Sequence, residues 1–403
     1  MQGALTGAAG VPFGAFLALA AASWLGLPLG ERTVSAVVVL SAAGSAGLLA
    51  AVACAGPAEV VLGTWFDGFP LVLAADGRSA SVGVLAALLG ALIGAFSRRY
   101  LHRDPGYRRF HLLLALFVAG VQLVVLAGTL DLVVVGWELT GLASALLIAF
   151  FHRRRGPVAH GLRAFVTYRV CDVGLVGAAV VAHHDGPPLA VGLLLLWGSM
   201  GKAAQFPVGG WLPRAMEGPT PSSAICYGAI SVSLGPYLLL RTESLWSQAP
   251  AMPVLIAVVG GLTALHATLA GRAQTDIKTS LAFASITQIG LVLVEIGLGW
   301  HVLALVHLLG HAALRSAQIL RSPSLLHDHH HLEQALGTAA PRTGTLRERL
   351  VPRPVRLWLY RFALERGYLD ALVVDRVAGG FVRLVRRLST ADEHWVRRLA
   401  AAR

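Results

Sequence analysis

Residues 193–213, LLLLWGSMGKAAQFPVGGWLP, begin as an apolar helix and then introduce a lysine, Lys202, followed by glycines and prolines. Only two of the chain's 33 lysine and arginine residues are lysines. A lysine ammonium can release its proton when its surroundings change, whereas an arginine stays charged. The prolines remove backbone donors and interrupt the helix. Within a membrane, irregular backbone needs protein or a water-filled cavity around it. The stretch therefore predicts a broken helix near residues 202–221.

The composition is that of a membrane protein. Hydrophobic residues make up 56% and charged residues 13% of the 403 positions, and the mean hydropathy is +0.67. These values argue against soluble domains and against nucleic acid as a partner. A helix needs about 20 mostly apolar residues to cross a bilayer. Eleven such runs occur, at residues 9–30, 34–55, 80–97, 110–128, 132–151, 163–182, 189–207, 220–240, 252–271, 279–298 and 301–320. We expect an all-α polytopic membrane protein with about 11 to 12 transmembrane helices.

Arginines are concentrated in alternate connections between these runs. The opposite connections, near Asp131 and at residues 183–188 and 299–301, carry almost none. By the positive-inside rule, the arginine-rich side is cytoplasmic. We expect a prokaryotic inner (plasma) membrane, an N-terminus outside, a short hairpin in an outer loop at residues 56–79 and a cytoplasmic tail. The arginines that support this are Arg98, Arg99, Arg103, Arg108, Arg109, Arg153, Arg154, Arg155, Arg214, Arg272 and Arg321.

Composition divides the chain into a transmembrane domain, residues 1–320, and a basic cytoplasmic tail, residues 321–403. Within residues 356–366, apolar and aromatic residues alternate with arginines in a helical pattern. Such a helix lies on the membrane surface or against a partner. Residues 369–388 fit either a twelfth span or a surface helix. The run HDHHH at residues 327–331 fits a docking surface, a solvated loop or a metal-binding stretch.

Several ionisable residues lie inside the predicted spans. A charge at the centre of a spanning helix costs about 2.5 to 3.5 kcal/mol, so it indicates a functional group that needs a partner. Three alternatives stay open: a structural ion pair three residues apart, core or zinc-binding histidines, and a lysine that snorkels to the interface. The residues are Glu138, Arg169, Asp172, Lys202, His307, His311 and Arg315.

Glu138 and Lys202 suggest a mechanism. If they approach each other, the pair can alternate between a closed, charged state and an open, neutral state as a proton arrives or leaves. Interrupted helices beside buried ionisable groups are typical of ion-translocating transporters. The three cysteines match no metal or disulfide spacing. The chain has no quinone, flavin, haem or nucleotide motif, so we expect no metal and no cofactor in it.

Seven motifs resemble, in order, the proton-conducting antiporter-like family. They are FPLVLAADGRS, SRRYLHRDPGYRRFHLL, GWELTGLASALLIAFF, AFVTYRVCDVG, GSMGKAAQFPVGGWLPRAMEGPTPSSA, QTDIKTSLAFASITQIG and HLLGHAALRSAQIL, within residues 60–320. That family includes the L-type (subunit 5) membrane subunit of NADH-quinone oxidoreductase and the A subunit of Mrp-type sodium/proton antiporters. It also includes the membrane subunit of the DAB-type inorganic-carbon accumulation complex. The resemblance implies a proton path inside the membrane.

The resemblance also implies roles for individual residues. Glu138 resembles the family's essential glutamate, and Lys202 resembles the broken-helix lysine that pairs with it. Asp172 resembles the acidic residue that modulates this pair. The positions that resemble parts of the central polar axis are Lys278, His307 and His311.

The sequence departs from the family pattern at three points. Arg315 stands where the family usually has a connecting lysine, and Tyr227 stands where a histidine is common. L-type and Mrp subunits continue through further helices, including a second broken helix, whereas this sequence passes from Leu320 to a short tail. We therefore expect a shortened member that works with a different partner.

These observations lead to an expected function. We expect a subunit that conducts protons and supplies their flow to an obligate partner. The DAB-type context fits best, in which the partner is a large soluble zinc protein resembling a carbonic anhydrase and bicarbonate accumulates. The alternative is an L-like subunit of a quinone oxidoreductase, a hydrogenase-related complex or an Mrp assembly, with other membrane subunits as partners. A non-pumping structural subunit is a third possibility, against which Glu138 and Lys202 argue.

Overall fold

The computed structural model describes residues 1–403 except 66–67, 337–350, 370–371, 373–375, 377–378 and 402–403. Of residues 323–336, 381, 394 and 396–401 it describes the backbone alone. The chain forms two compact units, Met1–Arg342 and Thr343–Arg403. The predicted end of the transmembrane domain at residue 320 falls inside the first unit and stays a prediction.

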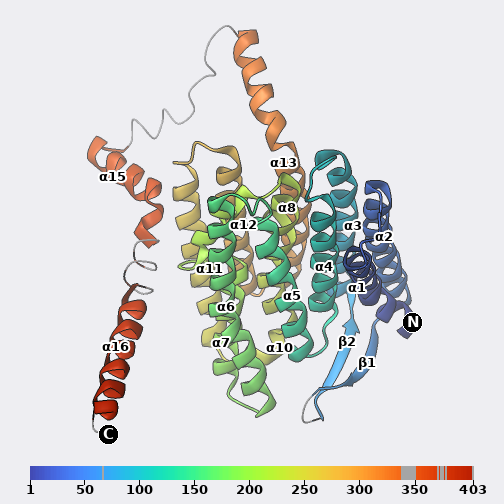
Figure 1. The fold of residues 1–403 in the computed structure, drawn as a ribbon, viewed down its shortest axis with the longest axis horizontal. Coiled ribbons are helices and arrows are strands. Elements are labelled where there is room, and N and C mark those ends of the chain that lie inside the picture. The colour runs from blue at the N-terminus through green and yellow to red at the C-terminus, as the bar shows by residue number, and fades with distance from the viewer. Residues whose placement is uncertain (66–67, 337–350, 370–371, 373–375, 377–378, 402–403) are drawn as a thin grey trace. The chain divides into compact units, whose positions relative to one another are not determined.

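The first unit is a bundle of helices with one β-hairpin (Figure 1). In the described part of the chain, ten helices are long and apolar enough to cross a membrane. They and the shorter α7 correspond one to one with the eleven predicted apolar runs, so the all-α polytopic fold is confirmed. The elements are α1 (Gln2–Trp24), α2 (Glu31–Ala55), β1 (Ala58–Thr64), β2 (Pro70–Ala75), α3 (Gly77–Tyr100), α4 (Tyr107–Leu126), α5 (Leu130–Ile148), α6 (Arg155–His183), α7 (Pro188–Lys202), α8 (Thr220–Ser222), α9 (Ile230–Arg241), α10 (Glu243–Trp246), α11 (Ala251–Gly271), α12 (Ile277–Gly297) and α13 (His301–Leu336).

The centre of the bundle is formed by α4 and by the span Thr220–Arg241, which comprises α8, a π-helical turn at Ser223–Ala229 and α9. Within the most apolar 18-residue window of each, 83% of α4 and 100% of Thr220–Arg241 is buried, against 33% of α1. The peripheral helices expose leucines and valines, as expected for surfaces that face lipid. The broken region after α7 therefore leads directly into the centre of the bundle.

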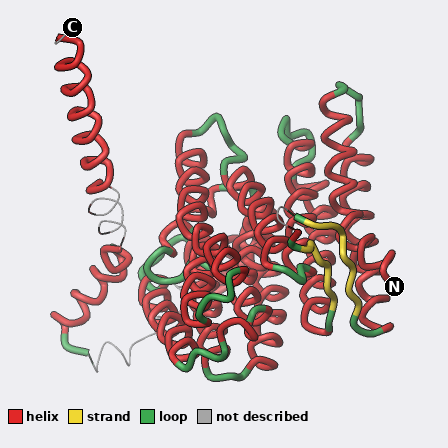
Figure 2. The backbone as a smooth tube through the Cα atoms, turned by 90° about the horizontal axis from the view of Figure 1, so that it is seen from below, coloured by secondary structure: helices red, strands yellow, loops and turns green. Residues whose placement is uncertain are grey.

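The hairpin predicted at residues 56–79 is present as β1 and β2, the yellow strands of Figure 2. The strands are antiparallel, and β2 also touches α4's end through a bridge between Leu73 and Ala127. Asp76 then caps α3 by accepting a hydrogen bond from the Ser79 amide at 2.8 Å, and it pairs with Arg241 of α9. Burial acts to raise the pKa of Asp76, but the Ser79 amide and the Arg241 guanidinium outweigh it and hold the pKa below its usual value.

The second unit contains α15 (Arg353–Leu364) and α16 (Gly379–Ala401). α15 forms where the alternating pattern at residues 356–366 predicts a helix, and it exposes Leu357, Trp358 and Tyr360. An attachment of these helices to the membrane surface stays a prediction. The proposed twelfth span at residues 369–388 falls partly on residues outside the described set, and the side chains of the HDHHH run at 327–331 lie outside it too.

Candidate functional site

The broken helix predicted near residues 202–221 is confirmed. α7 ends at Lys202, and the chain continues through two short 3-10 turns, Gly209–Trp211 and Pro213–Glu217, before α8 starts at Thr220. The Trp211 indole N–H donates to the Gly201 carbonyl at 3.0 Å. This bond satisfies a carbonyl at the helix end that the broken helix leaves without an intrahelical donor.

Lys202 is completely buried, with an exposed fraction of 0%. Its Nζ donates to the Trp137 carbonyl and to the Thr140 hydroxyl, both at 2.6 Å. The same atom lies 4.3 Å from the centroid of the Trp137 ring and 5.8 Å from that of Tyr168, distances suited to cation–π attraction. The ammonium is thus held inside the bundle, and the alternative in which it snorkels to the interface is wrong.

Glu138, Arg169 and Asp172 form one chain of ion pairs between α5 and α6. The Arg169 guanidinium pairs with Glu138 through Nη1 and donates to Asp172 Oδ2 through Nη2 at 2.7 Å. The second oxygen of Asp172 accepts a hydrogen bond from the Trp137 indole at 2.6 Å. The pair of Arg169 and Asp172 is therefore part of a larger network, in which Arg169 is shared by two carboxylates.

The predicted direct pairing of Glu138 with Lys202 is not present. Glu138 binds Arg169, and Lys202 binds the adjacent residue Trp137 and Thr140. The physical reason is helical geometry, because successive residues of α5 point about 100° apart. Trp137 and Thr140 face Lys202 in the centre, whereas Glu138 faces Arg169 at the rim, where their side chains are 35% and 34% exposed. Among the described residues, hydrogen bonds and ion pairs connect Lys202 to Glu138 through Trp137, Asp172 and Arg169.

The three α13 residues predicted from the sequence, His307, His311 and Arg315, each have separate surroundings; together they are called the second polar group. His307 contacts Glu295 Oε1 through Nδ1 and Gln288 Oε1 through Nε2, each at 2.8 Å. His311 is buried and its Nε2 has no protein partner. Arg315 Nη1 donates to Gln318 Oε1 at 2.8 Å. Within the described residues, no three His, Cys, Asp or Glu side chains are placed to hold a metal ion.

Two residues of α12 belong to this site although they were not selected from the sequence. Glu295 and Gln288 both bind His307. Glu295 lies in the apolar stretch LVLVEIG and has the same signal as Glu138, a carboxylate within a predicted span. Gln288 carries no charge, so its sequence gives no sign of a role. It is recognised as part of this group because α12 and α13 pack together and bring it to His307.

Lys278 lies apart from both groups. It is in the first turn of α12, and its Nζ donates to the Thr220 hydroxyl at 2.9 Å, at the start of α8. That hydroxyl also contacts the Tyr100 hydroxyl at 3.1 Å. Lys278 therefore connects the end of the broken region to α3 and α12.

Tyr227, which departs from the family pattern, lies in the π-helical turn that contacts both α5 and α13. Its hydroxyl donates to the Ser144 carbonyl of α5 at 2.8 Å. The next residue, Gly228, packs closely on α13, since a Cβ there would lie 2.6 Å from Ile319 and 3.3 Å from the Arg315 side chain. The π-helical turn thus lies between the Lys202 network and the α13 residues.

Comparisons with known proteins agree with this architecture. Residues 68–111 match the family described as NADH-Ubiquinone oxidoreductase (complex I), chain 5 N-terminus, and residues 185–340 match NADH:quinone oxidoreductase/Mrp antiporter, TM. NADH-quinone oxidoreductase subunit L of Mycobacterium tuberculosis (strain ATCC 25618 / H37Rv) is 36% identical over 318 residues, covering 74% of this chain and 48% of the relative. The Escherichia coli (strain K12) subunit L is 35% identical over 297 residues, covering 67% and 48%. The chain belongs to the antiporter-like family of membrane subunits.

Two solved structures have a fold similar to that of this antiporter-like chain. The Mrp complex from Dietzia sp. DQ12-45-1b superposes with a TM-score of 0.69 and 26% identity, covering 88% of this chain and 39% of that chain. An archaeal respiratory membrane complex, the membrane-bound sulfane sulfur reductase, shares the fold with a TM-score of 0.66 and 20% identity. The antiporter-like chain spans about half the length of the curated relatives that it matches.

Proposed function

We propose that the chain is a proton-translocating membrane subunit in which Lys202 is the switchable site. The observation that supports this most strongly is the complete burial of an ammonium on a broken helix, with two oxygen acceptors at 2.6 Å. A buried lysine has few structural advantages over an apolar residue, because its desolvation cancels much of what its hydrogen bonds contribute. Its retention at the start of the broken region favours a role in proton movement.

The network around Lys202 provides the switch. Glu138, Asp172, Arg169 and Lys202 together carry two negative and two positive charges when all are ionised. Loss of the Lys202 proton would leave one uncompensated negative charge in a low-dielectric interior. Arg169 keeps its proton, so it responds only by moving between Glu138 and Asp172. Proton arrival at Lys202 is in this way coupled to the position of a guanidinium at the rim of the bundle.

His307 and His311 provide a second set of groups that can exchange protons. His307 lies between a carboxylate, Glu295, and an amide, Gln288. Buried polar atoms without protein partners occur in both sets, including the Tyr168 hydroxyl beside Lys202 and His311 Nε2 on α13. Such atoms normally bond to internal water, which carries protons between side chains.

The finer context that we propose is inorganic-carbon uptake, with a large soluble zinc protein as the obligate partner. The exposed apolar and basic side chains of the helices α15 and α16 favour a soluble partner. The second candidate is an L-like role beside other membrane subunits, which the named relatives favour. Purification of the tagged full chain with its partners separates the two. A single zinc-binding soluble protein supports the first, and several multi-span subunits with iron–sulfur proteins overturn it.

The proton path itself is tested by substitution of Lys202 in the intact assembly. Lys202→Ala removes the ammonium, and Lys202→Arg keeps a charge that cannot leave. Both variants should abolish proton flux into liposomes that contain a pH-sensitive dye. Arg108→Lys is the matched control, since Arg108 is an exposed cation bonded to the carbonyls of Leu27 and Leu29. Wild-type flux in either Lys202 variant would refute the proposal.

A further inference from the structure

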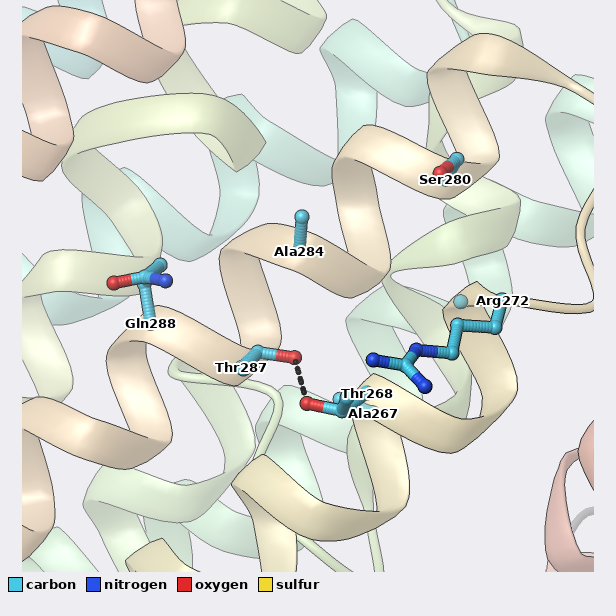
Figure 3. Close-up of a pocket in the computed structure, with 8 residues that line it drawn as sticks. Ala267, Thr268, Arg272, Ser280, Ala284, Thr287 and Gln288 are labelled. Carbon is cyan, nitrogen blue, oxygen red and sulfur yellow. Dashed lines mark hydrogen bonds between the residues drawn. The ribbon is translucent and has the colours of Figure 1, made fainter. Parts of the chain in front are cut away.

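A groove of about 300 Å³ lies between α11 and α12 (Figure 3). On α11, its lining residues Thr268 and Arg272 lie three and seven residues after Leu265, whose side chain is exposed. On α12, the lining residue Ala284 lies seven residues before Leu291, which is also exposed. Residues at these spacings share one face of a helix. The α11–α12 groove therefore opens on the apolar outer surface of the bundle, which faces lipid.

The polar side chains within the α11–α12 groove already have protein partners. The Thr287 hydroxyl donates to the Phe283 carbonyl at 3.1 Å, and the Thr268 hydroxyl lies 3.3 Å from the Thr287 hydroxyl, to which it can donate in turn (Figure 3). At the inner end, the Gln288 side-chain oxygen is bonded to His307. An apolar chain that enters the groove therefore takes no hydrogen bond away from these atoms.

The depth of the α11–α12 groove corresponds to one leaflet of a bilayer. α11 ends at Gly271 and α12 starts at Ile277, so the connection between them marks one surface of the bundle. From there to Gln288, α12 rises by about 16 Å, at 1.5 Å per residue. This is about half of the roughly 30 Å hydrocarbon layer. Two residues further along α12 the helices meet backbone to backbone, since a Cβ on Gly290 would lie 2.7 Å from the Gly260 carbonyl.

Arg272 places a cation at the mouth of the groove. It directly follows α11, its side chain is exposed, and Figure 3 shows it extending back toward Thr268. Within the described part of the chain its guanidinium has no hydrogen bond or ion pair, whereas that of Arg108 is bonded to two backbone carbonyls. The nearby carboxylate of Asp276 accepts from the Thr279 amide at the start of α12. A guanidinium with free donors fits the oxygens of a phosphate.

We propose that the α11–α12 groove binds one anionic phospholipid, with its phosphate on Arg272 and part of one acyl chain between the two helices. A basic pocket between spanning helices suits an anionic headgroup. A zwitterionic lipid has the same phosphate but no net charge, so Arg272 holds it less strongly. The site does not depend on the proposed function, because lipid binding can be measured in an assembly that conducts no protons.

Photo-crosslinking tests the site in the full chain within its purified assembly. The assembly is placed in phosphatidylcholine vesicles that contain a small amount of phosphatidylglycerol with a diazirine on one acyl chain. Light should attach this probe to the peptide that contains residues 267–288. A phosphatidylcholine probe with the same chains should label that peptide about fivefold less, the effect expected of one arginine beside an anionic lipid. Equal labelling by the two probes would overturn the proposal, and so would an unlabelled peptide beside labelled peptides from α6, since a partner would then cover the groove.

Substitutions separate the charge from the groove. Arg272→Gln should remove the preference for phosphatidylglycerol, and Arg272→Lys should keep most of it, because the charge remains. Ala284→Phe fills the groove and should lower labelling by both probes severalfold.

Two control variants should label as wild type does. Arg99→Gln removes an exposed cation in the last turn of α3, and Val258→Phe adds the same ring at an exposed position of α11 outside the groove. The yield of assembled complex shows whether each variant folds. An unchanged lipid preference in Arg272→Gln, or unchanged labelling in Ala284→Phe, would refute the site.

Discussion

Lys202 and Asp172 are bound by opposite ends of one residue, Trp137. The tryptophan carbonyl accepts from Lys202 Nζ at 2.6 Å, and its indole N–H donates to Asp172 Oδ1 at 2.6 Å. Lys202 and Asp172 are therefore connected through a single, fully buried residue.

We expect Trp137→Phe to weaken the network without removing its packing. The variant keeps an aromatic ring near Lys202 and the backbone acceptor, but it leaves a buried oxygen of Asp172 without its donor. The free energy of unfolding should fall by about 1 to 3 kcal/mol, measured by thermal unfolding of the purified assembly. Trp197→Phe is the control, because that indole bonds to the Val170 carbonyl near the surface. An equal loss in both variants would contradict the assigned role of Trp137.

Arg169→Gln should be more harmful than loss of a surface pair. The substitution leaves both Glu138 and Asp172 without their cation, and the unpaired charge of Asp172 is costly because that carboxylate is buried. Removal of Arg78, whose pair with Glu243 is 44% and 31% exposed, should cost at most about 1 kcal/mol. A double-mutant cycle of Arg169→Gln with Glu138→Gln measures the coupling. Independent, additive effects would show that the ion pair contributes nothing.

Gly141→Ala should reduce proton flux while leaving the fold intact. A Cβ at Gly141 would lie 3.3 Å from Arg169 Nη2 and 3.7 Å from Lys202 Nζ, so the methyl group enters the space between the two cations. Alanine is otherwise favoured over glycine within a helix by about 0.5 to 1 kcal/mol. We expect flux to fall about tenfold, equivalent to about 1.4 kcal/mol on the rate-limiting step.

Gly310→Ala is the matched control, since that Cβ has no neighbour within 4 Å. Both variants should reach the membrane in wild-type amounts. If the two substitutions change flux equally, the space between Arg169 and Lys202 has no special importance.

Asp76 should make the hairpin side of the bundle sensitive to acid. Its pKa is lowered in the folded protein because the Ser79 amide and Arg241 outweigh the opposing effect of burial. A carboxyl of this kind stabilises the fold above its unfolded pKa of about 4, and that contribution disappears as pH falls through the lowered folded value. Asp76→Asn should therefore cost about 1 kcal/mol at neutral pH and nothing in strong acid.

The control for Asp76 is Asp276→Asn, at another helix N-cap. Asp276 accepts from the Thr279 amide, and asparagine caps helices about as well as aspartate. Unfolding temperatures are measured for wild type and for Asp76→Asn at pH values from 7 down to strong acid. The variant should unfold at a lower temperature than wild type at neutral pH, and at the same temperature in strong acid. A constant difference at every pH would show that the charge of Asp76 is not the cause.

Much of the architecture follows from local sequence. Each predicted apolar run became a helix because about 20 consecutive apolar residues have few alternatives to a spanning helix. The prolines after Lys202 predicted the break for an equally local reason. The roles of Glu138, Asp172, Lys202, Lys278, His307, His311 and Arg315 in a proton path stay predictions.

Local sequence patterns were enough to locate the spans, the break at Lys202 and the ionisable residues inside the bundle. Which of these charges meet depends on how the helices pack. Glu138 and Trp137 are neighbours in sequence, yet Trp137 is fully buried against Lys202 and Asp172 whereas Glu138 reaches Arg169 at the rim, because each residue turns the helix by about 100°. The partners of a side chain depend on how α5, α6 and α7 are rotated and spaced, and no local pattern encodes that arrangement. Gln288 is a second example: it lies on α12, and its partner His307 lies on α13, so only the packing of these two helices brings them together.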